Sequence, residues 1–224
     1  MRWAVAGMAG MIGLAALSGC GGLEAAIDRQ PQKDPVSTGK PGEARKKLDK
    51  LAVKGRAPKT GFDRDEFGPA WADVDRNGCD TRNDILKRDL TDETFKSGTH
   101  DCIVLTGVLK DPYGGKTIKF RRGNDTSMAV QIDHLIPLSD AWQKGAQRWS
   151  ADKRKQFAND PLNLLAVDGP LNNQKSDSDA ATWMPPRRSY WCEYVTRQID
   201  VKAKYDLWVT EAEKKALERG LETC

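Results

Sequence analysis

The sequence predicts an α+β domain in which a β-hairpin and two further short strands are surrounded by helices. Two runs rich in β-branched residues, 102–111 and 116–122, flank a Gly-rich turn at 112–115 and predict the hairpin. Later apolar runs at 128–133 and 162–167 predict the further strands, and the intervening segments have polar, helical spacing. A chain of 224 residues is long enough for one ordinary domain with its own core plus an appendage.

The first nineteen residues predict a signal peptide. They carry one Arg, then an apolar run of about fifteen residues that is too short and too rich in Gly and Ala for a good membrane span. Leu17-Ser18-Gly19-Cys20 resembles a bacterial lipoprotein signal, in which Cys20 becomes the lipidated first residue. An ordinary cleaved signal with a chance cysteine is the alternative. Both predict an extracytoplasmic protein, lipid-anchored to the cell membrane or secreted.

The other cysteines predict disulfides, because an even set without a C-x-x-C pair in an oxidising compartment favours bridges over a zinc ribbon. They are Cys79, Cys102, Cys192 and Cys224. Four cysteines allow three connectivities, and the sequence does not choose among them. Cys79 with Cys102 and Cys192 with Cys224 would close the shortest loops.

Residues 20–60 are rich in Gly, Pro and Lys and predict a tether with one helix at 43–55, so the folded domain is expected to span 61–224. Within it, helices are expected at 83–90, through 139–158, from 171, at 190–205 and from 211. The 36 Lys and Arg residues against 32 Asp and Glu give a formal charge of +4. This slight excess permits a polyanionic partner without requiring one.

One constellation of polar residues follows the order strand, strand, helix. Asp133 and His134 end the third strand, Asn163 begins the next, and Asn172 lies in the helix after it. This order, with "IDHLIPLS", "NDPLNLLAV" and "LNNQK", resembles the ββα-metal (HNH, or His-Me finger) endonucleases. The resemblance covers about residues 62–224 and is closest to secreted HNH-family proteins with a D-H-x-x-P motif. The name HNH lists the three motif residues of the family, and the last of them is His. In this sequence Asn172 stands at that last position and still offers an oxygen ligand.

The resemblance implies a role for each of these four residues. His134, with an ordinary pKa near ~6.5, would be the general base. Asp133 and Asn172 would hold one divalent cation, Mg²⁺ first and Mn²⁺ or Zn²⁺ as alternatives, because hard cations prefer oxygen ligands and keep several waters. Asn163 would brace the loop that orients the imidazole. Cleavage would leave a 5′-phosphate and a 3′-hydroxyl.

Cationic side chains near the motifs are candidates for substrate contacts. Lys175, Arg187 and Arg188 could bind phosphates, or could form a basic surface without a ligand. Arg82 lies in "NGCDTRND", a segment that recurs in the resembling proteins, and could reach the scissile phosphate. Trp183, Trp191 and Tyr194 could stack on bases, but their spacing favours a place in the core.

A second acidic segment, "DVDRNGCDTRND", has a partial match to a calcium-binding loop. Asp73, Asp75, Asn77, Gly78 and Asp84 fall at positions 1, 3, 5, 6 and 12 of an EF-hand loop, but the last ligand is Asp rather than Glu. An Asn-Gly turn followed by a capped helix explains the same residues without a bound ion and is the favoured interpretation.

The sequence therefore predicts a monomeric endonuclease that acts on nucleic acid, DNA rather than RNA, and reaches the membrane through its lipid anchor. One alternative is a catalytically silent extracytoplasmic lipoprotein that binds polyanions. Another is a structural envelope protein in which the Asp and Asn residues only cap turns.

Overall fold

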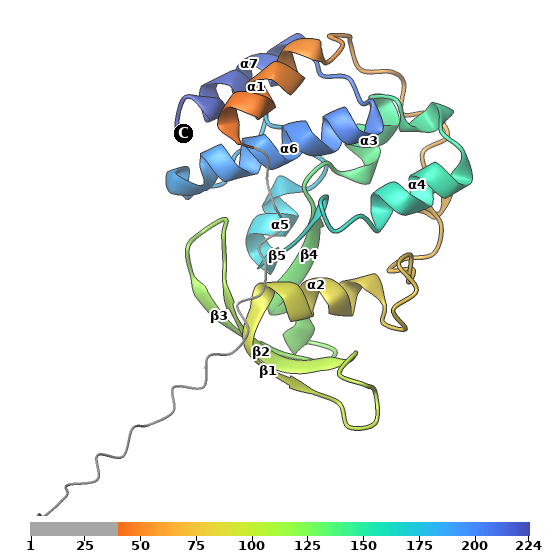
Figure 1. Ribbon diagram of the computed structural model, residues 1–224, viewed down its shortest axis with the longest axis vertical. Coiled ribbons are helices and arrows are strands. Elements are labelled where there is room, and N and C mark those ends of the chain that lie inside the picture. The colour runs from red at the N-terminus through yellow and green to blue at the C-terminus, as the bar shows by residue number, and fades with distance from the viewer. Residues whose placement is uncertain (1–39) are drawn as a thin grey trace, which may run out of the picture. The chain divides into compact units, whose positions relative to one another are not determined.

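The computed structural model describes residues Lys40–Cys224. The predicted signal peptide, Cys20 and the first half of the predicted tether lie outside the described residues. Seven α-helices and five strands are present in the described part of the chain (Figure 1). Their bounds are α1 Pro41–Lys50, α2 Thr81–Asp89, β1 Leu90–Phe95, β2 Val104–Lys110, β3 Thr117–Arg121, β4 Val130–His134, α3 Leu138–Gln143, α4 Ala151–Ala158, β5 Leu164–Asp168, α5 Gly169–Lys175, α6 Trp191–Tyr205 and α7 Glu211–Leu221.

The centre of the fold is a two-stranded antiparallel sheet followed directly by a helix. β4 pairs with β5 from Val130 opposite Asp168 to His134 opposite Leu164. α5 begins at the next residue, and the Asp168 side chain caps it by accepting a hydrogen bond from the Leu171 N–H. Strand, strand and helix thus follow one another as predicted, and the α+β fold class is confirmed.

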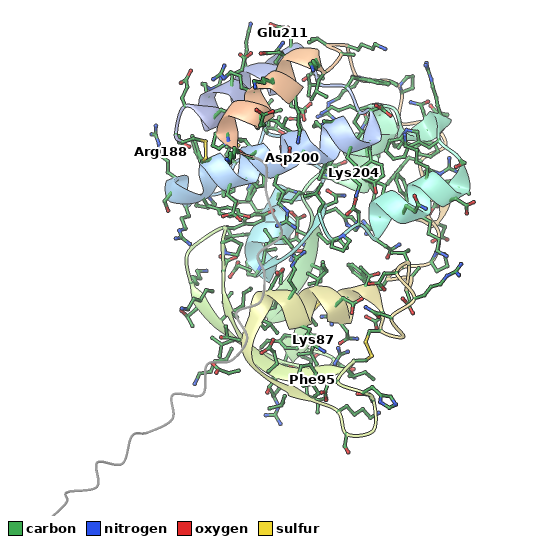
Figure 2. The ribbon with its side chains drawn as sticks, in the orientation of Figure 1. Lys87, Phe95, Arg188, Asp200, Lys204 and Glu211 are labelled. Atoms are coloured by element: carbon green, nitrogen blue, oxygen red, sulfur yellow. A yellow bond between two sulfur atoms is a disulfide. The ribbon has the colours of Figure 1, made fainter. Side chains whose placement is uncertain are left out.

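A second sheet contains β1, β2 and β3 in that order, with both pairs antiparallel. The β2–β3 hairpin was expected from its β-branched runs, whereas β1 was not, because no element was assigned to residues 91–95. α2 ends at Asp89 and the chain continues at once into β1. Lys87 on α2 lies with its Nζ 5.4 Å from the centroid of the Phe95 ring on β1 (Figure 2).

The segment 40–60 is part of the folded unit rather than only a tether. α1 packs against α6 and α7 (Figure 1), and its Ala44 and Leu48 are fully buried in the same cluster as Ile199 and Leu217. The chain after α1 stays in contact, since the Ala57 N–H donates to the Gln143 carbonyl oxygen at 2.9 Å. Ala44 and Leu48, both in the predicted helix, therefore belong to the hydrophobic core, and the folded part of the chain includes residues well before residue 61.

Two disulfides tie the described part of the chain. They join Cys79 to Cys102 and Cys192 to Cys224, the pairing that closes the shortest loops. In the chain-entropy description each bridge stabilises the fold by about 3 kcal/mol through the unfolded state. Among the residues described, no helix has the length and apolar character that a bilayer span requires.

Five buried charged side chains and the partly exposed Arg56 at their edge form a cluster between α3, α6, α7 and the segment after α5, hereafter the buried charge cluster. Its members are Arg56, Asp140, Lys144, Asp179, Lys202 and Glu213. Lys144 contacts three carboxylates at 2.6–2.8 Å and is fully buried. Three cations face three carboxylates, so the group is neutral as a whole, which is the condition under which buried charges are tolerated.

Candidate functional site

A cavity of about 850 Å³ opens beside the C-terminal half of β4. Its walls come from β4, from the start of α3, from the second half of α5 and the residues after it, and from the segments before α2 and β4. The residues that the argument uses are Lys59, Arg64, Trp71, Arg82, Arg122, Met128, Gln131, Asp133, His134 and Asn172. Asp133 and His134 both line it, although adjacent residues of a strand ordinarily face opposite sides. They are the last two residues of β4, and Pro137 follows His134 by three residues, just before α3 begins.

The Asp133 carboxylate is 4 % exposed and accepts two hydrogen bonds from buried donors. The Tyr113 hydroxyl donates to Oδ2, and Lys175 Nζ donates to Oδ1 at 2.9 Å. Burial raises the pKa of Asp133, while the charge of Lys175 and the bond from Tyr113 act against that rise. A carboxylate offers about four lone-pair directions, so two donors leave it able to take a further ligand.

The His134 imidazole is held at one nitrogen by the backbone. Nε2 lies 2.8 Å from the Ala158 carbonyl oxygen, which can only accept, so Nε2 carries the proton and Nδ1 is the basic nitrogen of the neutral ring. Burial lowers the pKa of His134 to about 4, so the ring is neutral at pH 7. The Trp71 ring is stacked at 15° to it, with 6.1 Å between the centroids.

Asn163 is fully buried and braces the chain that follows His134. Its Oδ1 accepts from the Ile136 N–H at 2.8 Å, its Nδ2 donates to the Ile136 carbonyl at 3.3 Å, and its own carbonyl accepts from the Leu135 N–H. Asn163 does not line the cavity. The supporting role expected of Asn163 stays a prediction, and these contacts are the ones through which it would act.

Asn172 lines the cavity from α5, and its Nδ2 donates to Gln131 Oε1 at 2.8 Å. That bond fixes the nitrogen side of the amide on Gln131 and assigns Oδ1 to the other side. One carboxylate and one amide oxygen suit Mg²⁺, which prefers oxygen ligands and retains waters. Among the described residues there is no group of three or more His, Cys, Asp or Glu side chains that could hold a metal. Asp133 and Asn172 therefore fit a largely hydrated hard cation better than a Zn²⁺ site.

Lys175 occupies a place other than the phosphate contact expected of it. The side chain is fully buried, and Nζ also donates to the His134 carbonyl at 2.8 Å. Its charge is therefore directed to Asp133 and the backbone of β4. This burial was not predictable, because a single lysine at the end of a short helix has the same sequence pattern whether it faces solvent or the core.

The three arginines that were expected to contact phosphates lie in two different parts of the structure. Arg82 lines the cavity with Arg122, and the pKa of Arg82 is lowered by burial and then by the positive charge of Arg122. Two neighbouring cations whose charges oppose each other would be relieved by an anion. Arg187 donates to Ser189 and Arg188 stacks over Trp191, where Figure 2 shows Arg188 at the start of α6. Neither lines the cavity.

The acidic segment before α2 forms a hydrogen-bonded turn. Asp73 accepts from the Asn77 and Gly78 N–H groups, and the Asn77 amide donates to Asp75 and Asp84. The Asp80 side chain then caps α2 by accepting from the Asn83 N–H. These contacts match the favoured interpretation, a tight turn followed by a capped helix.

Tyr113, Trp71, Arg122 and Gln131 belong to the site but escaped the sequence interpretation. Tyr113 stands in the hairpin turn, where a Pro-Tyr-Gly-Gly sequence already explains the residue as a turn former. No local signal indicated that its hydroxyl reaches β4. Gln131 could have been found, since it precedes Asp133 by two residues and so shares its face of the strand.

Comparison with known proteins identifies relatives of the chain. Residues 80–219 match the family model described as GmrSD restriction endonucleases, C-terminal domain. The chain is also 38 % identical over 196 residues to a protein of Arthroderma benhamiae described as an uncharacterized secreted protein. That alignment covers 87 % of this chain and 91 % of the relative. The family match contains β4, β5 and α5 and therefore every residue of the strand–strand–helix constellation.

Proposed function

Because the chain belongs to the family of GmrSD restriction endonuclease C-terminal domains, we propose that it is an endonuclease that hydrolyses nucleic-acid phosphodiester bonds. The observation that carries this proposal is the common cavity of Asp133, His134 and Asn172. The carboxylate and the amide oxygen can hold a divalent cation, and a neutral imidazole with a fixed tautomer can take a proton from water, so together they can support metal-assisted phosphodiester hydrolysis.

His134 is the proposed general base, and Nδ1 is its acting atom. The oxygen of a water molecule forms a bond to phosphorus while its proton passes to Nδ1, and the bond from phosphorus to the 3′ oxygen breaks. That oxygen takes a proton from solvent, which leaves a 3′-hydroxyl and a 5′-phosphate. The Ala158 carbonyl keeps the imidazole oriented throughout, because the proton on Nε2 remains engaged with it.

Asp133 and Asn172 would hold the divalent cation, Mg²⁺ or Mn²⁺. When bound, such an ion offsets negative charge on the phosphate oxygens as a Lewis acid. Tyr113 and Lys175 keep the Asp133 carboxylate in one orientation, so the ligand is preorganised. Arg82 and Arg122 supply positive charge at the cavity wall for neighbouring phosphates of the strand, a contribution that does not depend on base sequence.

An extracytoplasmic location is supported by the two disulfides and by the secreted description of the fungal relative. Residues 1–19 are the proposed signal peptide, with Cys20 as the proposed lipidation site. Mass spectrometry of the membrane fraction of an expressing bacterium tests this, since a diacylglyceryl mass on Cys20 is expected and an unmodified N-terminus would contradict it.

The activity is tested by incubating the full chain with supercoiled plasmid and, separately, with RNA, in Mg²⁺ or in EDTA. His134→Ala should lower the cleavage rate by about 10²–10⁴. The matched control is His100→Ala, since His100 is the other of the two histidines and is exposed in a turn. Equal degradation by wild type and His134→Ala would contradict the proposal and indicate a contaminating nuclease. Salt-sensitive DNA retention without cutting would support the silent polyanion-binding alternative.

A further inference from the structure

Met128 is an exposed apolar residue among the polar and cationic residues that line the cavity. It is 57 % exposed and lines the cavity from the short 3₁₀ turn Thr126–Ala129. Val53 and Val74 are the other large hydrophobic side chains with comparable exposure in the described part of the chain, and neither lines the cavity.

The backbone at Met128 is held in place rather than loosely attached. A Cβ atom at Gly169 would lie 2.0 Å from the Met128 carbonyl oxygen, so only glycine at the start of α5 permits this approach. The preceding residue is also tied, because the Ser127 N–H donates to the Gly123 carbonyl and the Gly123 N–H donates to Ser127 Oγ. The exposed methionine is thus presented by a fixed turn packed against α5.

The remaining walls combine an aromatic ring with cations. Trp71 is partly buried and lines the cavity beside His134, held by a left-handed backbone conformation with φ of 58°. Arg82, Arg122 and Lys59 line the same cavity. Apolar or aromatic platforms for bases, combined with cations for the backbone, are the arrangement by which proteins bind single-stranded nucleic acid.

A paired duplex would not use these walls. In a duplex the faces of the bases are stacked inside, and the strand presents charged phosphates and sugars to the protein. Contact with an exposed methionine adds little binding energy to these polar groups. The volume of about 850 Å³ falls within the ~300–1,000 Å³ of pockets that enclose whole small molecules. It exceeds the space that one phosphodiester group needs.

Resting on the proposed nuclease function, we propose that the cavity receives an unpaired nucleobase next to the cleaved phosphodiester, against Met128 and Trp71. The preferred substrate is therefore single-stranded or locally unpaired nucleic acid. Met128 contacts the base and acts as a specificity residue, whereas the reaction itself depends on Asp133, His134 and Asn172.

Binding tests the inference independently of cleavage. The full chain carrying His134→Ala is titrated into fluorescent 30-nucleotide strands in single-stranded form, as a perfect duplex, and as a duplex with a central four-nucleotide bulge. The unpaired forms should bind about tenfold more tightly than the duplex, and adding Met128→Ala should remove most of that difference. Met128→Leu should retain it, and Val74→Ala, a change at an exposed apolar residue outside the cavity, should leave it unaltered.

Equal affinity for paired and unpaired strands, or an unchanged preference in the Met128→Ala background, would overturn the inference. Cleavage by the chain with native His134 is measured on the same strands and on methyl p-nitrophenyl phosphate, a phosphodiester without a base. Met128→Ala should lower kcat/KM about tenfold on unpaired strands and leave the small diester unaffected. Loss of rate on both substrates alike would contradict a base contact. Strand binding with the expected preference but no cleavage by the wild type would instead contradict the proposed function.

Discussion

Lys175 Nζ lies 2.9 Å from Asp133 Oδ1, and both side chains are buried. This contact links α5 to the end of β4, so the carboxylate that the proposed function assigns to the cation is already paired with a resident positive charge. Removing one partner of such a pair leaves the other charged group buried without compensation, which costs more than the pair contributes.

Lys175→Met should therefore lower the free energy of unfolding by about 3–5 kcal/mol at pH 7. The pKa of Asp133 should also rise in this variant. In the wild type the positive charge of Lys175 offsets part of the increase that burial causes, and the substitution removes that charge. Urea denaturation followed by circular dichroism measures the first effect. Lys119→Met, at an exposed lysine of β3, is the control and should change stability by less than about 0.5 kcal/mol. Similar losses in the two variants would show that the buried pair has no special role.

Asn163→Ala removes both side-chain bonds to Ile136 and leaves a buried N–H and C=O unsatisfied. The expected cost in stability is about 2–4 kcal/mol. The cleavage rate at a temperature where the variant is folded should fall about 10–100-fold, because His134 directly precedes the braced loop. Asn124→Ala, at an exposed position, provides the comparison. A variant that is less stable but cleaves at the wild-type rate would refute the bracing role.

Tyr113→Phe deletes one hydroxyl and preserves the ring in its aromatic cluster with Tyr190, Trp183 and Tyr194. Since that hydroxyl donates to Asp133, Mn²⁺ affinity should weaken about 10–100-fold. Titration followed by electron paramagnetic resonance measures free Mn²⁺ without any need for turnover. Tyr190→Phe is the matched control, at a neighbouring buried tyrosine of the same cluster. Unaltered Mn²⁺ binding in Tyr113→Phe would exclude Tyr113 from positioning the ligand.

Asp179 gives the buried charge cluster a dependence on pH. Burial alone would raise its pKa, but the charge and hydrogen bond of Lys144, with Arg56, outweigh burial and lower it. The folded protein therefore binds this proton more weakly than the unfolded chain. The ionised Asp179 carboxylate therefore stabilises the fold fully above its unfolded-state pKa of about 3.9. This stabilisation is lost as the pH falls through the lower pKa of the folded state.

Asp179→Asn should accordingly destabilise the protein by about 3 kcal/mol at pH 7, and the difference from wild type should shrink below about pH 4. Thermal unfolding across pH 3–8 follows this. Asp49→Asn, at an exposed residue of α1, is the control and should change stability at pH 7 by less than about 0.5 kcal/mol. A gap between Asp179→Asn and wild type that stays constant down to pH 3 would contradict the assignment.

The parts of the fold that were predictable depend on local patterns. The β2–β3 hairpin follows from β-branched runs around Gly114 and Gly115, and the order β4, β5, α5 follows from apolar runs that end in turn residues. β1 was not predictable from Leu90–Phe95, because Asp92 and Glu93 are poor strand formers and Asp92 has φ of 54° at an irregularity of the pairing. Here tertiary pairing with β2 overrides local preference.

The site divides in the same way. Asp133, His134 and Asn172 could be placed together because one continuous strand–strand–helix unit carries them. Trp71 and Arg122 could not, since they come to the cavity from loops whose paths depend on the three-stranded sheet and α2. The burial of Lys175 depends on how α5 packs against β4. The residues next to Lys175 in the sequence do not determine that packing.

The two turns of the three-stranded sheet differ in what they tolerate. Asp111, in the β2–β3 turn, is fully buried and accepts from the Asp168 N–H at 2.9 Å, so this turn is hydrogen-bonded to the residue that caps α5. The opposite turn, 97–100, is largely exposed. A protein engineer who wishes to insert a reporter peptide or a dye-labelling tag should choose 97–100. An insertion of the same length beside Asp111 would unfasten the frame on which the proposed catalytic groups are mounted.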